Sequence, residues 1–132
     1  MRPENATPGE TGSPVPSEPA QGIAAVAIGR NEGARLEACL SSLSRRVERI
    51  VYVDSGSTDD SLAVAAAIGA EIVELDMDRP FTAARARNAG LARLGEDIAF
   101  VQFIDGDCVL RPDWIPAARA FLDATPAAAV AC

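Results

Sequence analysis

The sequence contains no histidine and no lysine, so all 12 of its basic residues are arginines. A catalytic triad with histidine, a zinc site with histidine ligands and a lysine Schiff base are therefore excluded. The 19 acidic residues outnumber the arginines and leave a net charge of −7. Because phosphate neutralisation by basic residues supplies most of the affinity for nucleic acid, so acidic a chain is a poor nucleic-acid binder. An anionic ligand would need a metal ion to mediate its binding.

Long apolar runs and paired cysteines are missing as well. No stretch approaches the roughly 18 consecutive apolar residues of a membrane span, and the first residues lack the basic patch and apolar run of a signal peptide. Cys39, Cys108 and Cys132 show no Cys-x-x-Cys spacing, so we interpret them as reduced, small hydrophobic residues. We expect a cytoplasmic protein, at most peripheral to the inner face of the membrane.

The composition changes near residue 23. Residues 1–22 hold five of the nine prolines and almost no large apolar side chains, a composition typical of a disordered tail. From Ile23 onward, short apolar runs alternate with helical patterns, which predicts one domain over 23–132. Alanine makes up 26 of the hydrophobic residues, so the core of this domain must be tightly packed.

The apolar runs predict strands of a parallel sheet. They begin near Ile23, Arg49, Glu71, Ile98 and Ala127. Each run is apolar on consecutive positions, as expected of strands that are covered on both faces. The segments between them are helical in pattern, so the fold class is an α/β protein with an open, mostly parallel, Rossmann-like sheet and helices on both faces.

Four helices are expected between and after these strands. The first has an apolar stripe at Leu36, Leu40, Leu43 and Val47. The others are indicated by capping residues: a helix capped by Ser57 or Thr58 that stops at Gly69, one capped by Thr82 that runs to Leu94 and stops at Gly95, and one with Pro112 in its first turn.

Three of the predicted strands end in acidic residues, and ligands of open parallel sheets bind at the carboxyl ends of the strands. The most specific of these ends is Asp105-Gly106-Asp107. Its two carboxylates can converge on a hard cation, because Gly106 lets the backbone bend, and oxygen ligands suit Mg²⁺ or Mn²⁺. A tight Asp-Gly turn or a helix cap is the alternative interpretation.

Two further positions leave alternatives open. Asp54 can accept hydrogen bonds from a nucleobase or a ribose hydroxyl, or it can bind only the backbone of its own loop. Arg85 and Arg87 are two residues apart and cannot share one helix face, so at most one of them points into the site, while an exposed arginine is the other interpretation. Asn88 and Gly90 are expected to make room where this helix approaches the strands.

Four segments in this order resemble the N-terminal half of the family 2 glycosyltransferases, which have the GT-A fold. They are VAIGRNEG, VYVDSGSTDDS, PFTAARARNAGL and FIDGDCVL. The resemblance covers about Ile23 to the end of the chain. It implies inverting transfer of a sugar from a nucleotide-diphosphate donor to an acceptor hydroxyl, with a divalent metal and with a role in polysaccharide biosynthesis.

The resemblance also implies roles for individual residues. Asn31 and Glu32 match a pair near the nucleoside, Asp54 the residue that holds the base, and Arg87 an arginine near the base or phosphates. Asp105 and Asp107 match the Asp-x-Asp element, the first near the ribose and the metal and the second on the metal.

The resemblance places the general base beyond Cys132, in a second half together with the acceptor-binding surface. The run over 127–132 is predicted to be a buried strand, and we expect the chain to be a fragment. The alternative to a transferase is a non-catalytic module that binds a nucleotide and a metal. A sugar-phosphate nucleotidyltransferase is disfavoured, because its glycine-rich, arginine-containing loop and its lysine are missing.

Overall fold

The computed structural model describes residues 20–132, so most of the predicted tail over 1–22 lies outside the described part. Four strands and four helices alternate along it. Their bounds are β1 Ala20–Gly29, α1 Ala34–Leu43, β2 Val47–Asp54, α2 Ser61–Ile68, β3 Glu71–Glu74, α3 Ala83–Leu91, β4 Phe100–Asp105 and α4 Trp114–Ala124. Among these residues no helix is long and apolar enough to span a membrane.

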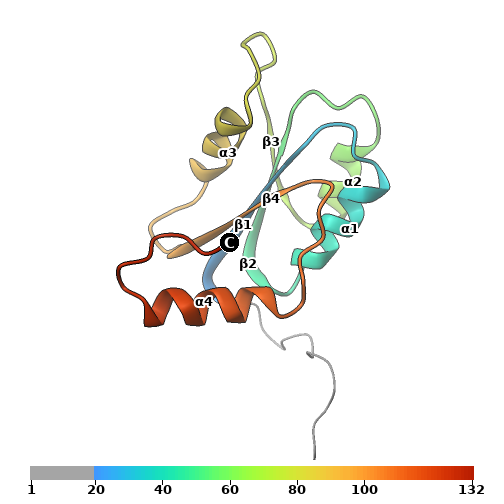
Figure 1. Ribbon diagram of the computed structural model, residues 1–132. Helices are drawn as coiled ribbons and strands as arrows, with labels where there is room; N and C mark the ends of the chain where they lie inside the picture. Colours follow the sequence, from blue (N-terminus) through green and yellow to red (C-terminus); the bar gives the residue numbers. More distant parts are fainter. Residues whose placement is uncertain (1–19) are drawn as a thin grey trace, which may run out of the picture. The chain divides into compact units, whose positions relative to one another are not determined.

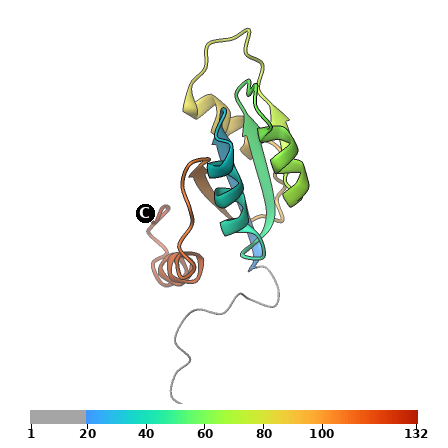
Figure 2. The ribbon, with the colours of Figure 1, turned by 90° about the vertical axis from the view of Figure 1, so that its right-hand side faces the viewer.

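The four strands form one sheet in the order β3-β2-β1-β4, and every neighbouring pair is parallel. β1 lies inside the sheet, where Val26 pairs with Val51 of β2 on one side and with Phe103 of β4 on the other. Figure 1 shows α1 and α2 on one face of this sheet and α3 on the opposite face, and Figure 2 shows the same arrangement from the side. The predicted fold class is confirmed.

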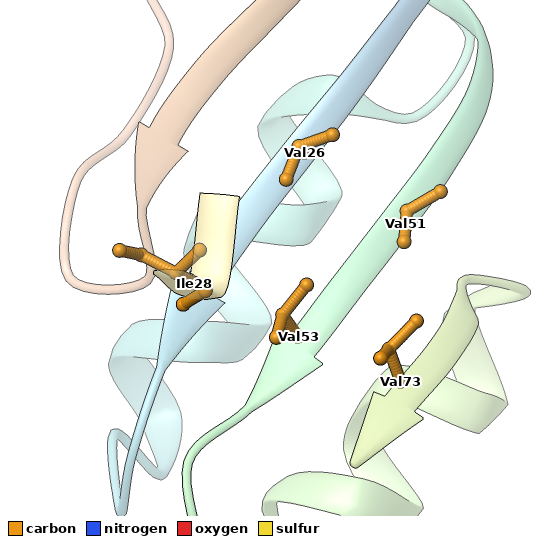
Figure 3. Packing of buried hydrophobic residues seen from close by; sticks show 6 residues of the cluster. Val26, Ile28, Val51, Val53 and Val73 are labelled. Carbon is orange, nitrogen blue, oxygen red and sulfur yellow. The ribbon is translucent and has the colours of Figure 1, made fainter. Parts of the chain in front are cut away.

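The core under α3 is built from branched side chains of three strands. Val26 and Ile28 of β1, Val51 and Val53 of β2 and Val73 of β3 are buried together with Ala86 of α3, and Figure 3 shows how the strand residues line one face. Side chains alternate between the faces of a strand. Tyr52 and Asp54 therefore point to the opposite face, toward α1 and α2.

α3 approaches the sheet closely at Gly90. A Cβ atom placed there would overlap Cγ1 of Val26 and lie 3.0 Å from Cγ2 of Val53. The prediction that Gly90 makes room for the sheet is confirmed.

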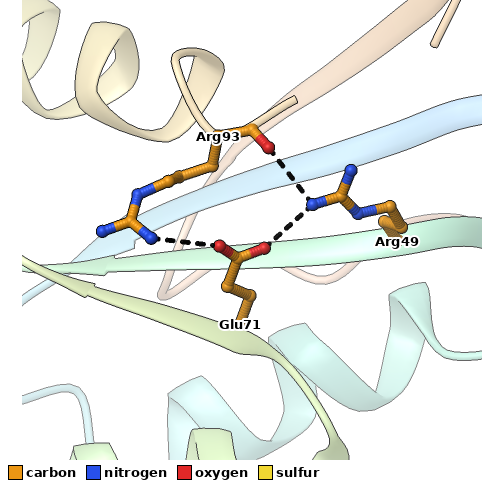
Figure 4. Close-up of polar contacts among 3 residues, drawn as sticks. All are labelled: Arg49, Glu71 and Arg93. Atoms are coloured by element: carbon orange, nitrogen blue, oxygen red, sulfur yellow. Dashed lines mark hydrogen bonds and ion pairs between the residues drawn. The ribbon is translucent and has the colours of Figure 1, made fainter. Parts of the chain in front are cut away.

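At the amino end of the sheet, Glu71 joins two arginines (Figure 4). Its carboxylate lies 2.9 Å from Nη2 of Arg49 and 3.3 Å from Nη1 of Arg93, and Arg49 also donates to the carbonyl of Arg93. These contacts join β2, β3 and the segment that follows α3. The side chains are 37–52% exposed, so each pair contributes at most about 1 kcal/mol.

Several predicted boundaries were wrong. β1 begins at Ala20, before the predicted Ile23, because Gly22 has a φ of 74° and the pairing with β2 shifts there, so the strand continues through an irregularity. Val47 belongs to β2 rather than to the first helix, which ends at Leu43. A helical stripe cannot distinguish a last helical position from the first residue of the following strand.

The helix caps were predicted in part. Thr82 accepts a hydrogen bond from the Arg85 amide at 3.0 Å, and Gly69 ends α2 in the left-handed conformation, so both predictions are confirmed. The predicted caps at Ser57 and Thr58 are wrong, since α2 begins at Ser61 after Asp60. α3 ends at Leu91 rather than Leu94.

The last part of the chain differs most from the prediction. One compact unit holds all four strands and α1 to α3, and it ends at Arg111; Pro112–Cys132 belongs to a second unit with α4. Pro112 precedes α4 and its cap, Asp113, instead of lying in the first turn. The expected strand over 127–132 is absent, and Val130 is 72% exposed. Alanine, which dominates this run, is depleted in strands.

Candidate functional site

The site residues predicted from the sequence lie at the carboxyl ends of β1, β2 and β4 and on α3. β1 leads into Asn31 and Glu32, β2 ends at Asp54, and β4 ends at Asp105. Because these strands are parallel and adjacent, the three ends share one edge of the sheet. The contacts among them show which residues are brought together.

Asp54 is held by its own loop. Only 2% of the residue is exposed. Oδ1 accepts hydrogen bonds from the Tyr52 hydroxyl at 2.8 Å and the Ser57 hydroxyl at 2.5 Å, and Oδ2 accepts from the amides of Gly56 at 3.1 Å and Ser57 at 2.8 Å. A carboxylate offers about four lone-pair sites. In the described structure Asp54 therefore shapes the turn that follows β2, which was one of its two predicted roles.

Asn31 connects the loop after β1 to the loop after β2. Its side-chain Oδ1 accepts hydrogen bonds from the backbone amides of Thr58 at 2.7 Å and Asp59 at 3.3 Å. The backbone amide of Asn31 donates to Ser57 Oγ at 2.9 Å. Asn31 has a φ of 52°, a conformation that asparagine tolerates better than most residues. The asparagine thus fixes the loop after β1 and the loop after β2 relative to each other.

Glu32 lies beside the Asp-x-Asp element. Its Cγ atom would be 3.4 Å from a Cβ atom at Gly106. Its Oε2 is buried and lies 3.1 Å from Nε of Arg35, but it accepts no hydrogen bond from the residues that the structure describes. This buried oxygen is therefore held by the charge of Arg35, whose side chain is 68% exposed.

Asp105 and Asp107 flank a glycine that touches β1. The Gly106 amide donates to the Ile28 carbonyl at 2.7 Å, and a Cβ atom at Gly106 would lie 3.1 Å from that same oxygen. Both aspartates are exposed. Gly106 thus lies against the end of β1 and beside Glu32, with one exposed aspartate on either side of it in the sequence.

α3 contributes Arg87 to this edge. Its Nη2 atom lies 3.1 Å from Oδ1 of Asp105, and both side chains are partly exposed. Arg85 instead donates to backbone carbonyls of the preceding connection. The prediction that at most one of these arginines faces the site agrees with this arrangement, with Arg87 as the one that does.

α1 anchors the Asp-x-Asp segment from below. Cys39 Sγ donates to the Asp105 carbonyl at 3.5 Å, and Ser42 Oγ accepts from the Leu110 amide at 2.9 Å. Burial, with the nearby Cys108, Asp107, Asp105 and Glu32 as smaller causes, raises the pKa of the Cys39 thiol to about 12. Cys39 is therefore a neutral thiol that supports the segment, in agreement with its interpretation as a reduced hydrophobic residue.

The donor set suits a hard cation shared with a ligand. Mg²⁺ is commonly bound by one or two carboxylates together with substrate phosphates, and Asp105 and Asp107 supply two exposed carboxylates. Residues 20–132 contain no group of three acidic or cysteine side chains that would enclose a metal by itself. Asp107 would be the main ligand, because Asp105 is paired with Arg87.

Sequence reasoning missed two groups that shape the site. Tyr52 precedes Asp54 by two positions on the same strand, so alternation alone would have placed its hydroxyl on the same face. Ser57 was read as a helix cap, but its hydroxyl joins Asp54 to Asn31. Both act through contacts that depend on the turn geometry after β2.

The sequence of the chain is similar to those of known proteins. A family model described as Glycosyl transferase family 2 matches residues 26–132. The chain is similar to an uncharacterised glycosyltransferase of Rickettsia felis, with 39% identity over 51 residues, which make up 39% of this chain and 18% of that protein.

Two solved structures resemble the fold. Glucosyl-3-phosphoglycerate synthase from Mycobacterium tuberculosis, in a complex with Mn²⁺, UDP and glucosyl-3-phosphoglycerate, superposes with a TM-score of 0.63 at 32% identity, over 76% of this chain and 39% of that one. S. aureus TarS has a TM-score of 0.62 at 21% identity, over 79% of this chain and 20% of that one. The chain thus spans well under half the length of these relatives.

Proposed function

Because this chain belongs to glycosyl transferase family 2, we propose that it provides the donor-binding part of an enzyme that transfers a sugar from a nucleotide-diphosphate donor to an acceptor hydroxyl. The proposal includes inversion at the sugar carbon and the use of Mg²⁺ or Mn²⁺. A role in polysaccharide assembly, at a cytoplasmic location that includes the inner face of the membrane, belongs to the same proposal.

One observation carries the proposal: Asp105, Asp107, Arg87 and Glu32 meet at one edge of the sheet. A bound divalent cation would supply positive charge between the acidic edge and a diphosphate. Arg87 adds a side-chain cation that is paired with Asp105 of this element, and an arginine fork suits phosphate oxygens. The complexes of the similar synthase with UDP and Mn²⁺ or Mg²⁺ support the same ligand class.

The nucleoside is proposed to lie over the ends of β1 and β2. Asn31 joins the two loops there, and Glu32 lies beside Gly106 with one carboxylate oxygen ion-paired to Arg35. Asp54 is proposed to hold the base, and in that case its contribution comes through the loop that it shapes or by exchange of one of its hydrogen bonds.

A non-catalytic binding module is the second candidate. Inverting transfer needs a base near the attacking hydroxyl. The carboxylate of Asp54 accepts hydrogen bonds from its own loop, and the carboxylate of Asp105 is paired with Arg87. Neither carboxylate is therefore available as the general base. This observation favours a base supplied from outside residues 1–132 or, if there is none, binding without transfer.

Calorimetric titration with UDP and with GDP, in Mn²⁺ and in chelator, tests the proposal. We expect metal-dependent binding, and the Asp107→Ala variant should lose the metal dependence and about 1.5–3 kcal/mol of binding free energy. Asp97→Ala removes the same charge in the segment that precedes β4 and should bind like the wild type. Equal affinity in chelator and in Mn²⁺ would refute the metal-bridged site.

Transfer is tested separately by following donor turnover. We expect residues 1–132 to bind the nucleotide without transferring the sugar. We expect a version extended along the reading frame to transfer it. Absence of transfer in both would favour the binding module.

A further inference from the structure

The connection between β3 and α3 is fastened by one side chain that the proposed site does not use. The guanidinium of Arg85 donates from Nη1 to the carbonyls of Arg79 and Pro80, each at 3.1 Å, and from Nη2 to the carbonyl of Asp76. Arginine presents five donors in a rigid planar fork, so a single side chain can hold three carbonyls in one fixed arrangement.

Two local contacts complete this arrangement. The Asp78 amide donates to Asp76 Oδ1 at 2.9 Å, and the Arg85 amide donates to Thr82 Oγ1 at 3.0 Å. These contacts tie the segment over 76–82 to the first turn of α3, and Arg85 makes most of them. In Figure 1 this connection is the yellow segment that extends beyond the strand ends.

Met77 carries this segment toward the turn that Asp54 shapes. The Met77 Cγ atom would be 3.2 Å from a Cβ atom at Gly56. Gly56 has a φ of 82°, and its amide donates to Asp54 Oδ2. The side chain of Met77 thus occupies the space that a side chain at position 56 would need.

Met77 is also 41% exposed, so part of its apolar surface remains open next to a polar edge. Thioether groups make favourable contacts with aromatic rings, and a nucleobase has an aromatic face. At the end of β2 the open surface of Met77 is therefore suited to the base of the bound nucleotide.

We propose that Arg85 is a positioning residue that holds the 76–82 segment so that Met77 forms one wall for the nucleobase, and that this wall contributes to base selectivity. This inference rests on the proposed function. Arg85 acts through the backbone and Met77, and it does not contact the phosphates.

The test compares four variants by calorimetric titration with UDP, GDP and UMP in Mn²⁺. Arg85→Ala and Met77→Ala remove the clamp and the wall, and Arg85→Lys keeps the charge but not the fork. Arg79→Ala is the matched control, because that exposed side chain makes no hydrogen bond or ion pair within the described part and its carbonyl survives the substitution. Melting curves confirm that each variant folds.

We expect Arg85→Ala and Met77→Ala to weaken binding of the preferred base by about tenfold and to narrow the difference between UDP and GDP. UMP and UDP should be affected by the same factor, because the wall touches the base. Arg79→Ala should stay within about twofold of the wild type, and Arg85→Lys should resemble Arg85→Ala.

Other results overturn the inference. A loss confined to UDP and absent for UMP, or rescue by lysine, would assign Arg85 to the phosphates. Wild-type affinity and selectivity in Arg85→Ala would remove the role altogether.

Hydrogen exchange of the 76–82 amides in the free protein separates this inference from the proposed function. Faster exchange in Arg85→Ala than in Arg79→Ala is expected whether or not a nucleotide binds, and equal exchange overturns the clamp. If the wild type binds no nucleoside diphosphate, the proposed function and the selectivity role both fail.

Discussion

The Tyr52 hydroxyl donates a 2.8 Å hydrogen bond to Oδ1 of Asp54, two residues further along β2. The tyrosine is fully buried, and it is the only tyrosine of the sequence. Burial, and next the hydrogen bond to the Asp54 carboxylate, raises the pKa of the Tyr52 phenol well above its ordinary value. A single side chain thus links the sheet to the turn that Asp54 shapes.

Tyr52 should make the protein sensitive to alkaline pH. Because its pKa is higher in the folded than in the unfolded state, its contribution to stability is complete below pH ~10 and is lost as the pH rises above that value. Ultraviolet titration should show no phenolate near pH 10 in the folded protein and normal ionisation in denaturant. Phenolate that forms near pH 10 in the folded protein would contradict this expectation.

Tyr52→Phe is the matched variant. It should lower the free energy of unfolding at neutral pH by about 1–3 kcal/mol, because Asp54 loses a donor while it stays buried. It should also remove part of the alkaline loss of stability. Cys39, whose pKa is raised as well, would account for a remainder.

Gly90→Ala should destabilise the protein although alanine is the better helix former. The helix propensity gain is about 1 kcal/mol, but the added methyl group meets Val26 and Val53, and overpacking of this kind costs about 1–3 kcal/mol. Chemical denaturation measures the difference. Ala84→Gly, at an exposed position of α3, is the control for propensity alone and should cost up to about 1 kcal/mol.

The three cysteines should divide by reactivity. Cys39 is buried with a pKa of about 12, whereas Cys108 and Cys132 are exposed. Because the thiolate is the reactive form, a thiol reagent at pH 8 should modify Cys132 readily in the folded protein. Cys108 should react more slowly, because burial and next the hydrogen bond to Asp107 raise the pKa of its thiol. Cys39 should react only after unfolding. Mass spectrometry of the labelled peptides identifies the sites. Prompt labelling of Cys39 under native conditions would show that α1 opens readily.

The sequence predicted those features that depend on local or repeated patterns. Runs such as the one ending at Val53 are apolar on consecutive positions because both faces of the sheet are covered, so the parallel sheet and its acidic ends could be foreseen. Thr82 and Gly69 act within one helix turn. That at most one of Arg85 and Arg87 faces this edge could also be foreseen, since two residues two positions apart cannot share a helix face, whereas the pairing of Arg87 with Asp105 was not predicted.

The rest depends on contacts between distant segments or on competition between patterns. Ser57 has the chemistry of a helix cap, and only the turn after β2 directs its hydroxyl to Asp54 instead. The clamp of Arg85 needs the folded path of 76–82, which no periodicity encodes. The run over 127–132 was predicted to be a strand because it is apolar. Alanine, its main residue, has only a weak preference for extended backbone, and the structure has no strand there.

The place of β1 within the sheet has a consequence for how the chain acquires its structure. β1 is synthesised first and can pair with β2 soon afterwards. Its other edge pairs with β4, which is synthesised only after α1, α2 and α3, so Ile28 can pair with Asp105 only at that late stage. Non-local pairings of this kind slow folding. During synthesis the unpaired edge of β1 would be open to any other extended segment, and the closing of that edge by β4 also forms the acidic end of the sheet.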